Sequence, residues 1–239
     1  MGYIQFATSS QPKTLYIPIQ GGQSYTFTNN KDYTKALVFL AGAGGGGGGY
    51  YLSGSTSYLG GGGGSGSVLY FTVSLSEGDS ISVSVGTGGA PGTSGSSPTQ
   101  GSAGGSTTLT ITDVNGNTYT FTAGGGEGGH PGTLSGNGSG GAGGTTSISS
   151  SSNAPPRFVN IHYQANGNAG SGASGGAGVS DTSIIQSLLN LLSTDTIGSI
   201  GLGEVILNNF ASGSGGTGGA YPNPAKSGTD GIALLVLLP

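Results

Sequence analysis

Short apolar runs, either alternating with polar residues or continuous, recur along the chain and predict β-strands. Strict alternation in Ser24–Thr28 indicates a strand with one buried face. The continuous run Ala36–Leu40 indicates a strand that is buried on both faces, and the run Ile232–Leu238 indicates a buried strand. The second of these runs is far too short to cross a bilayer, which takes roughly 20 apolar residues.

Two pairs of such runs are separated by short polar turns and predict β-hairpins. Val68–Leu75 and Ile81–Val85 flank a turn of sequence EGD. Thr108–Thr112 and Thr118–Thr122 alternate strictly around Asn115-Gly116, a pair that is typical of the type I′ turn. We therefore expect two hairpins in this part of the chain.

The periodicity changes once, in residues 181–192, where apolar residues recur at helical spacing behind a candidate N-cap, Asp181. The apolar face is wide for a surface helix. We expect Ile184, Leu188 and Leu191 to contact another subunit, with capping of the protein's own core as the alternative. Residues 198–210 (GSIGLGEVILNNF) are expected to include a short strand.

Glycine fills the spaces between the strands, and 55 of the 239 residues are glycine. The runs 44–49 and 60–64 are pure glycine, and 124–144, 166–178 and 213–219 are rich in it. Glycine loses more backbone entropy on folding than any other residue, so ordered runs need dense backbone contact. Packed helices of the polyproline II type, with three residues per turn, would provide it. Solvated loop tips are the alternative.

Together these patterns predict an all-β protein with packed, polyglycine-II-like segments, β-hairpins and one short helix. Residues 1–35 form an N-terminal β or attachment segment in this interpretation. Residues 36–239 form a glycine-rich domain, with an insertion at about 145–212 that carries the helix.

Charge is scarce, since Asp, Glu, Lys and Arg make up 6% of the residues and the net charge is −4. The five basic residues are scattered, which argues against binding to nucleic acid or to an anionic membrane. The absence of cysteine excludes a disulfide framework and a thiolate metal site. The start MGYIQFATSSQPK lacks the basic and apolar regions of a secretory signal, so we expect none.

Candidate catalytic groups are few. A glycine run satisfies GxGxxG trivially, and no strand–GxGxxG–helix unit with a distal acid follows it. Glu127 and His130 stand three residues apart in GGGEGGHPG, where a polar loop explains them better than a metal or acid–base pair. We expect no enzymatic activity, no cofactor and no metal.

The tyrosines are the better candidates for a functional site. Tyr50, Tyr51 and Tyr58 lie in YYLSGSTSYL between two glycine runs, and Tyr221 lies in AYPNPAKSG. Tyrosine offers a rigid, amphipathic contact surface, so such loops could bind a receptor. The alternative is that these rings pack on the protein itself or on another subunit.

Four motifs in order resemble the glycine-rich domain of phage tail-fibre and tail-tip proteins. They are ALVFLAGAGGGGGG, a valine-rich strand with an EGD turn and a VGTGG exit, the TLTITDVNGNTYTFTAGGG hairpin, and a GTDG turn before the last strand. The resemblance covers residues 36–144 and 213–238. The sequence is also loosely similar to the distal tail-fibre adhesins of T4-like phages, in which loops between polyglycine II helices bind host receptors.

The resemblance implies a virion protein of the phage tail that is part of a homo-oligomer and contacts other tail proteins. It also implies binding to a host surface receptor, either a glycan or an outer-membrane protein, without membrane insertion. Two alternatives stay open: a purely structural virion component such as a fibre, collar or head decoration, and a self-assembling extracellular glycine-rich filament.

Overall fold

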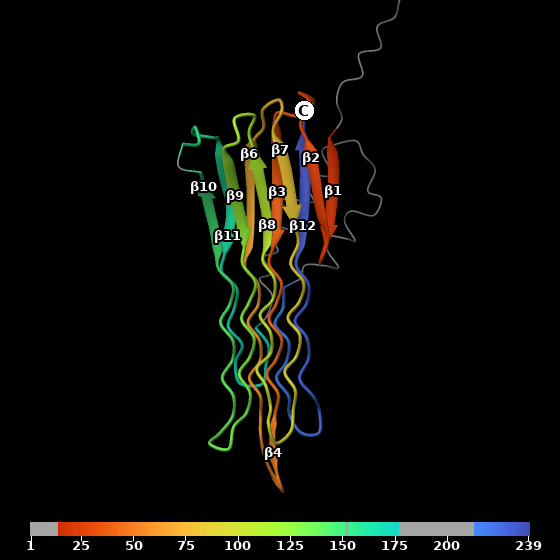
Figure 1. Cartoon of the computed structure of the whole chain (residues 1–239), viewed down its shortest axis with the longest axis vertical. Coiled ribbons are helices and arrows are strands. Elements are labelled where there is room, and N and C mark those ends of the chain that lie inside the picture. The colour runs from red at the N-terminus through yellow and green to blue at the C-terminus, as the bar shows by residue number, and fades with distance from the viewer. Residues whose placement is uncertain (1–13, 152, 177–212) are drawn as a thin grey trace, which may run out of the picture.

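The computed structural model describes residues 14–151, 153–176 and 213–239. These residues form an elongated molecule with two parts (Figure 1). A pair of β-sheets occupies one end, and extended glycine-rich segments run from the strands to the other end. We call the two parts the sandwich and the bundle.

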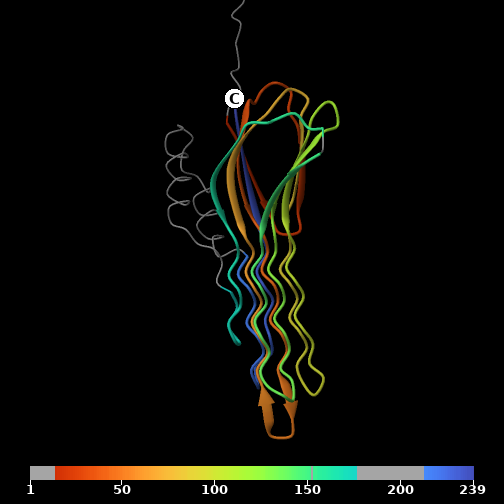
Figure 2. The same cartoon turned by 90° about the vertical axis from the view of Figure 1, so that its left-hand side faces the viewer.

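The sandwich consists of two five-stranded antiparallel sheets, which face each other in Figure 2. The first sheet has the order β1-β12-β3-β6-β11 and the second the order β10-β9-β8-β7-β2. Strands β4 (Tyr51–Ser53) and β5 (Thr56–Tyr58) form a separate two-stranded sheet. The sandwich strands are β1 (Leu15–Gln20), β2 (Ser24–Thr28), β3 (Lys35–Ala41), β6 (Val68–Ser74), β7 (Ser80–Ser84), β8 (Thr107–Thr112), β9 (Thr118–Ala123), β10 (Thr146–Ser150), β11 (Val159–Ala165) and β12 (Ile232–Leu238).

The main core lies between the sheets, where Phe71 of β6 stacks on Phe121 of β9 with ring centroids 4.2 Å apart. A second buried cluster, which includes Leu37 and Phe39, belongs to the other face of the first sheet. Val38 and Leu40 of the same strand lie in the main core. The prediction that 36–40 is buried on both faces is therefore confirmed, and so is the prediction of a buried strand at 232–238.

The predicted pairing of Val68–Leu75 with Ile81–Val85 is wrong, although both strands exist. Strand β6 pairs with β3 and β11 in the first sheet, and β7 pairs with β2 and β8 in the second. The chain crosses between sheets at residues 75–79. The continuously apolar β6 fits the sheet that is buried on both faces, whereas the alternating β7 fits the sheet with one core face.

The second predicted hairpin is confirmed, because β8 and β9 pair in register from Thr107↔Ala123 to Thr112↔Thr118. The turn type is wrong. A type I′ turn needs positive φ at both central residues, and here Gly116 has φ 81° while Asn115 is not left-handed. The Asp113 side chain accepts hydrogen bonds from the N–H groups of Asn115 and Asn117, which holds a longer turn.

The bundle surrounds residues 42–49, which continue directly from β3 and are buried throughout. Successive residues face different neighbours, with a repeat of three residues. Their N–H groups donate to backbone carbonyls of three segments, over 2.8–3.0 Å. Ala43, Gly46 and Gly49 donate to Gly105, Ser102 and Thr99, respectively. Gly44 and Gly47 donate to Thr229 and Lys226, and Gly45 and Gly48 donate to Gly64 and Gly61.

The carbonyl groups of 42–49 accept from three further segments, 89–92, 126–132 and 216–219, so this central helix has six hydrogen-bonded neighbours. Three residues per turn, no internal hydrogen bonds and outward-pointing backbone groups are the features of a polyproline-II-type helix. The packed-helix prediction therefore holds for these residues, and the solvated-loop alternative does not.

Residues 60–67 form a second helix of this kind, also buried throughout. Their N–H groups donate to segments 213–219, 124–130 and 168–172. A side chain on either helix would meet a neighbour on any side, which explains why the two pure glycine runs fall here. The buried residues of these two helices that are not glycine, such as Ala43 and Ser65, have small side chains.

The outer segments of the bundle need glycine on their inner side only. In residues 86–93, Gly86, Gly89 and Gly92 are buried at a spacing of three, whereas Thr87 and Ala90 are exposed. A glycine every third residue thus marks the face that packs against the centre.

The described part of the chain is all-β and contains no α-helix. The predicted helix at 181–192 and the predicted strand within 198–210 lie outside the described residues. Two stretches of the expected insertion, β10 and β11, are edge strands of the two sheets.

Candidate functional site

Four segments that are distant in sequence meet at the free end of the bundle, and we call them the tip. They are residues 50–59, 93–99, 131–138 and 219–224. The β4–β5 hairpin in the first segment forms the lower extremity of the molecule in Figures 1 and 2. Each other segment reverses the chain between two bundle helices, with turns bridged at Thr133↔Gly136 and Ala220↔Asn223.

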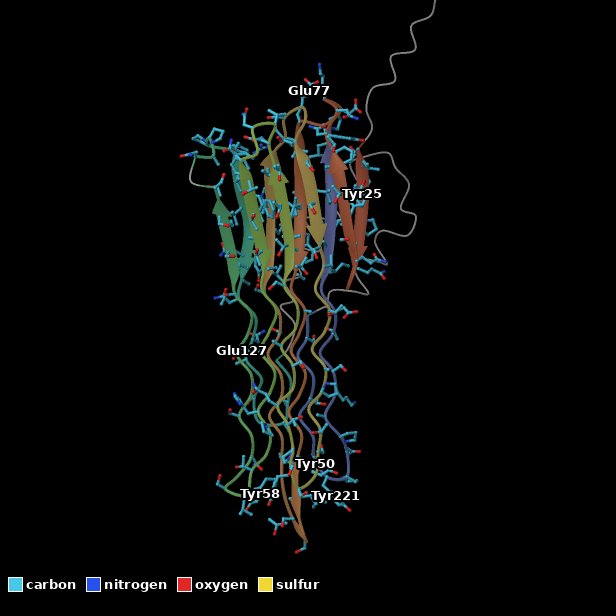
Figure 3. The ribbon with its side chains drawn as sticks, in the orientation of Figure 1. Tyr25, Tyr50, Tyr58, Glu77, Glu127 and Tyr221 are labelled. Carbon is cyan, nitrogen blue, oxygen red and sulfur yellow. The ribbon has the colours of Figure 1, made fainter. Side chains whose placement is uncertain are left out.

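All four tyrosines expected to bind a receptor lie at this tip, and Tyr50, Tyr58 and Tyr221 are labelled there in Figure 3. Tyr51 and Tyr58 are directly opposite each other on β4 and β5, with ring centroids 6.4 Å apart. The Tyr50 and Tyr221 rings meet edge to face at 5.9 Å. The structure thus brings Tyr221 to the other three across more than 160 residues of sequence.

Backbone hydrogen bonds hold the tip segments together. The Tyr50 N–H donates to Ser94 Oγ, and the Tyr50 carbonyl accepts from Gly95 N–H at 3.0 Å. The Leu52 N–H donates to the Gly95 carbonyl at 2.9 Å, so segment 93–99 lies alongside β4. On the other side, Leu59 N–H donates to Asn137 Oδ1 at 2.8 Å. The hairpin segment is therefore fixed relative to segments 93–99 and 131–138.

The tip exposes apolar and aromatic surface. Tyr221 is 60% exposed, Leu134 69% and Leu59 36%, while Tyr50 and Tyr58 are half-buried. The tyrosine rings thus pack on one another and still face solvent in part. Sequence reasoning did not find Leu134, Asn137 or the segment 93–99. The only sequence feature that set Leu134 apart was its position as an isolated apolar residue in a polar, glycine-rich stretch. Its place at the tip depends on the fold of the whole bundle.

The opposite end of the molecule carries a buried ion pair. Arg157 and Asp79, with 8% and 1% of their side chains exposed, share two hydrogen bonds. The guanidinium also donates to the Ser74 carbonyl and lies 4.6 Å over the Tyr119 ring. Burial would lower the pKa of Arg157, but the hydrogen bonds and charge of Asp79 outweigh it and raise that pKa. Arg157 is thereby held in its charged form and joins residues near β11 to the β6–β7 connection.

A groove of about 320 Å³ lies beside Arg157, between the edge strands β10 and β11. Tyr119, Ile148, Pro155 and Val159 contribute to its walls. The only ionisable groups there are Arg157, which is already engaged with Asp79, and Tyr119, whose hydroxyl donates to the Pro155 carbonyl. Both of these groups are therefore already engaged within the protein.

The other residues that the sequence singled out lie away from the tip or outside the described residues. Glu127 and His130 project from the outer face of a bundle helix, one turn apart, rather than from a loop. Among the described residues, no three potential ligands gather into a metal site, and none of the segments forms a helix long and apolar enough to cross a membrane. Ile184, Leu188 and Leu191, predicted to contact another subunit, are outside the described residues.

Comparison with models of protein families gives a match to this chain. The model of a family described as a glycine-rich domain matches residues 19–236, which include eight of the ten sandwich strands in full, the end of β1, most of β12 and the entire bundle. No curated protein matches the sequence.

Proposed function

The chain belongs to the glycine-rich domain family, and we propose that it is a non-enzymatic attachment protein of a phage tail fibre or tail tip. In this proposal the sandwich and bundle are a scaffold that presents the tip to a receptor on the host surface. The phage assignment rests on the motif resemblance set out above, and the receptor-binding role rests on the tip.

The observation that carries the proposal is the convergence of four tyrosines at one extremity. Tyr51 and Tyr58 come from the β4–β5 hairpin, and Tyr221 comes from the last turn of the bundle. A folding core would gather aromatic rings inside the molecule, whereas these lie partly exposed at its end. Tyrosine is enriched at the energetic centres of binding surfaces because it combines a large apolar ring with a hydroxyl.

The scaffold suits this role because its helices are cross-linked by backbone hydrogen bonds along their length. Loops that are held in one geometry lose less entropy on binding than free loops do. The same cross-linked bundle also supports the second candidate, a purely structural virion component, in which the tip would contact only another virion protein.

Binding to bacterial cells tests the proposal. Purified protein should bind cells of at least one strain in a panel and should block phage adsorption to that strain. Tyr221→Ala should weaken binding about ten-fold or more, the loss expected of a central aromatic contact. Phe158→Ala is the matched control, because Phe158 is 62% exposed but lies at the sandwich end, next to β11.

The proposal predicts that the control variant binds as the unchanged protein does. Equal losses in the two variants, or no binding to any strain, would contradict receptor binding through the tip and favour the structural role.

A further inference from the structure

Apart from the tyrosine hydroxyls, ionisable side chains are absent from the tip. Residues 50–59, 93–99, 131–138 and 219–224 contain no Asp, Glu, Lys, Arg or His. In the sandwich, by contrast, charged residues occupy the turns at the far end, where Lys31 pairs with Glu77 and Arg157 with Asp79. The nearest ionisable residues along the chain, His130 and Lys226, belong to outer bundle helices, at positions whose carbonyls accept from Gly61 and Gly47.

A charged ligand would therefore find no counter-charge at the tip. A phosphate or carboxylate that gives up water on binding needs charged donors or several hydrogen bonds in return, and Arg and Lys are the residues that usually supply them. A protein receptor is also a poor match for the tip. About a quarter of the residues in ordinary proteins are charged, and a binding partner normally places complementary charges opposite them. The chemistry of the tip favours an uncharged partner.

What the tip does offer is aromatic rings beside hydroxyl and amide groups. The exposed ring of Tyr221 lies edge to face with Tyr50, and Asn223 of the same turn is exposed. Ser94 and Asn137 stand on the two flanking segments, where they fix the hairpin. An aromatic face can cover the apolar C–H face of a sugar ring, while hydroxyls and amides can exchange hydrogen bonds with sugar hydroxyls.

We infer that the tip binds an uncharged saccharide of the cell surface, with the Tyr221 ring as its main contact. This inference rests on the proposed function and narrows its receptor from a glycan or a protein to a neutral glycan. It makes binding insensitive to ionic strength, because no ion pair contributes.

Two treatments of a strain that the full-length protein binds separate the possible receptors. Periodate oxidises vicinal hydroxyls of surface sugars, and proteinase K removes exposed surface protein. The inference predicts that periodate reduces binding at least about ten-fold and that proteinase K leaves it unchanged. Raising the salt from about 0.1 to 1 M, which shortens the Debye length from about 10 to 3 Å, should change the affinity less than about two-fold.

Immobilised polysaccharides and tip variants give the direct measurement. The protein should bind at least one neutral polysaccharide, such as a mannan or a dextran, and should not prefer phosphorylated or uronic-acid polymers. Tyr221→Phe, which keeps the ring, should retain more of this binding than Tyr221→Ala, and Phe158→Ala should retain all of it.

Failure of the inference and failure of the proposed function are distinguishable. Binding that Tyr221→Ala removes, but that proteinase K also removes, would overturn the saccharide and leave a protein receptor. Tip-dependent binding that falls steeply with salt would overturn the neutral ligand. If no strain and no polymer is bound in a Tyr221-dependent manner, the proposed function itself is wrong.

Discussion

The glycines of the central run are required individually, because neighbouring backbone touches each of them. A Cβ atom added to Gly46 would lie 2.0 Å from the Ala90 carbonyl oxygen, and one added to Gly45 would lie 2.1 Å from that of Glu127. At Gly47 the corresponding distance is 2.0 Å, to Thr217. The three obstacles belong to three different helices, so no rotation of the central helix could relieve them.

We expect Gly46→Ala to destabilise the fold by more than the roughly 1–3 kcal/mol typical of an extra group in a packed core, since the group it meets is backbone. The measurement is urea or thermal unfolding followed by circular dichroism. Ala90→Val is the control, because Ala90 is exposed on the adjoining outer helix and its added methyl groups should reach solvent. Equal melting temperatures for Gly46→Ala and the unchanged protein would contradict close packing at this position.

The sequence predicts only part of the tyrosine cluster at the tip. Tyr50, Tyr51 and Tyr58 could be grouped from the sequence because they are neighbours in it. Their proximity to Tyr221 depends on the bundle, in which Gly219 N–H donates to the Gly48 carbonyl and thereby aligns the two turns. No local pattern encodes that pairing.

At the scale of elements, the hydrophobic pattern predicted seven of the twelve described strands, β2, β3, β6, β7, β8, β9 and β12. Apart from the β8–β9 hairpin, it did not predict how these strands pair. The run 68–75 and the run 81–85 are close in sequence, and a short turn made a hairpin the simplest expectation. The alternation within β7 records only that one face is buried, and it does not specify which strands lie beside β7. Pairing depends on which sheet can bury both faces of β6, and that is a property of the whole sandwich.

The bundle helices repeat every three residues, so the effect of inserting a single residue can be predicted. In the central run 44–49 every position is glycine, so inserting one more glycine between Gly46 and Gly47 keeps glycine at every buried position, although it moves the hairpin outward and rotates it by a third of a turn. In the outer segment 86–93, one glycine inserted between Gly88 and Gly89 rotates the following residues by a third of a turn. Pro91 would then replace Gly92 on the inner face.

We expect the insertion after Gly88 to destabilise the protein far more than the insertion after Gly46. At the inner position Gly92 N–H donates to the Gly47 carbonyl, and proline has no N–H to replace it. An added Cβ there would also lie 2.0 Å from the Thr99 carbonyl oxygen. Denaturant unfolding of the two insertion variants compares them directly, and similar losses of stability would contradict the three-residue period.

At the scale of the whole molecule, the limits of the described chain and the tip lie at opposite ends. Residue Leu15 pairs with Leu237 of β12, and the Thr34 hydroxyl donates to the Pro239 carbonyl, so residues at both limits of the described chain lie at the sandwich end. The tip lies at the opposite extremity (Figure 1). A partner joined at Pro239 would therefore stand the full length of the molecule away from Tyr221.

This polarity predicts unequal effects of a bulky addition. A small folded domain fused after Pro239 should leave cell binding unchanged, whereas the same domain inserted between Gly54 and Ser55, in the β4–β5 turn, should abolish it. Both sites are exposed, and a Cβ at Gly54 would meet nothing within 4 Å, so neither addition should lower the melting temperature of the sandwich and bundle. If the addition after Pro239 blocked binding and the one at the turn did not, the receptor would contact the sandwich, and the tip would be the end that joins the particle.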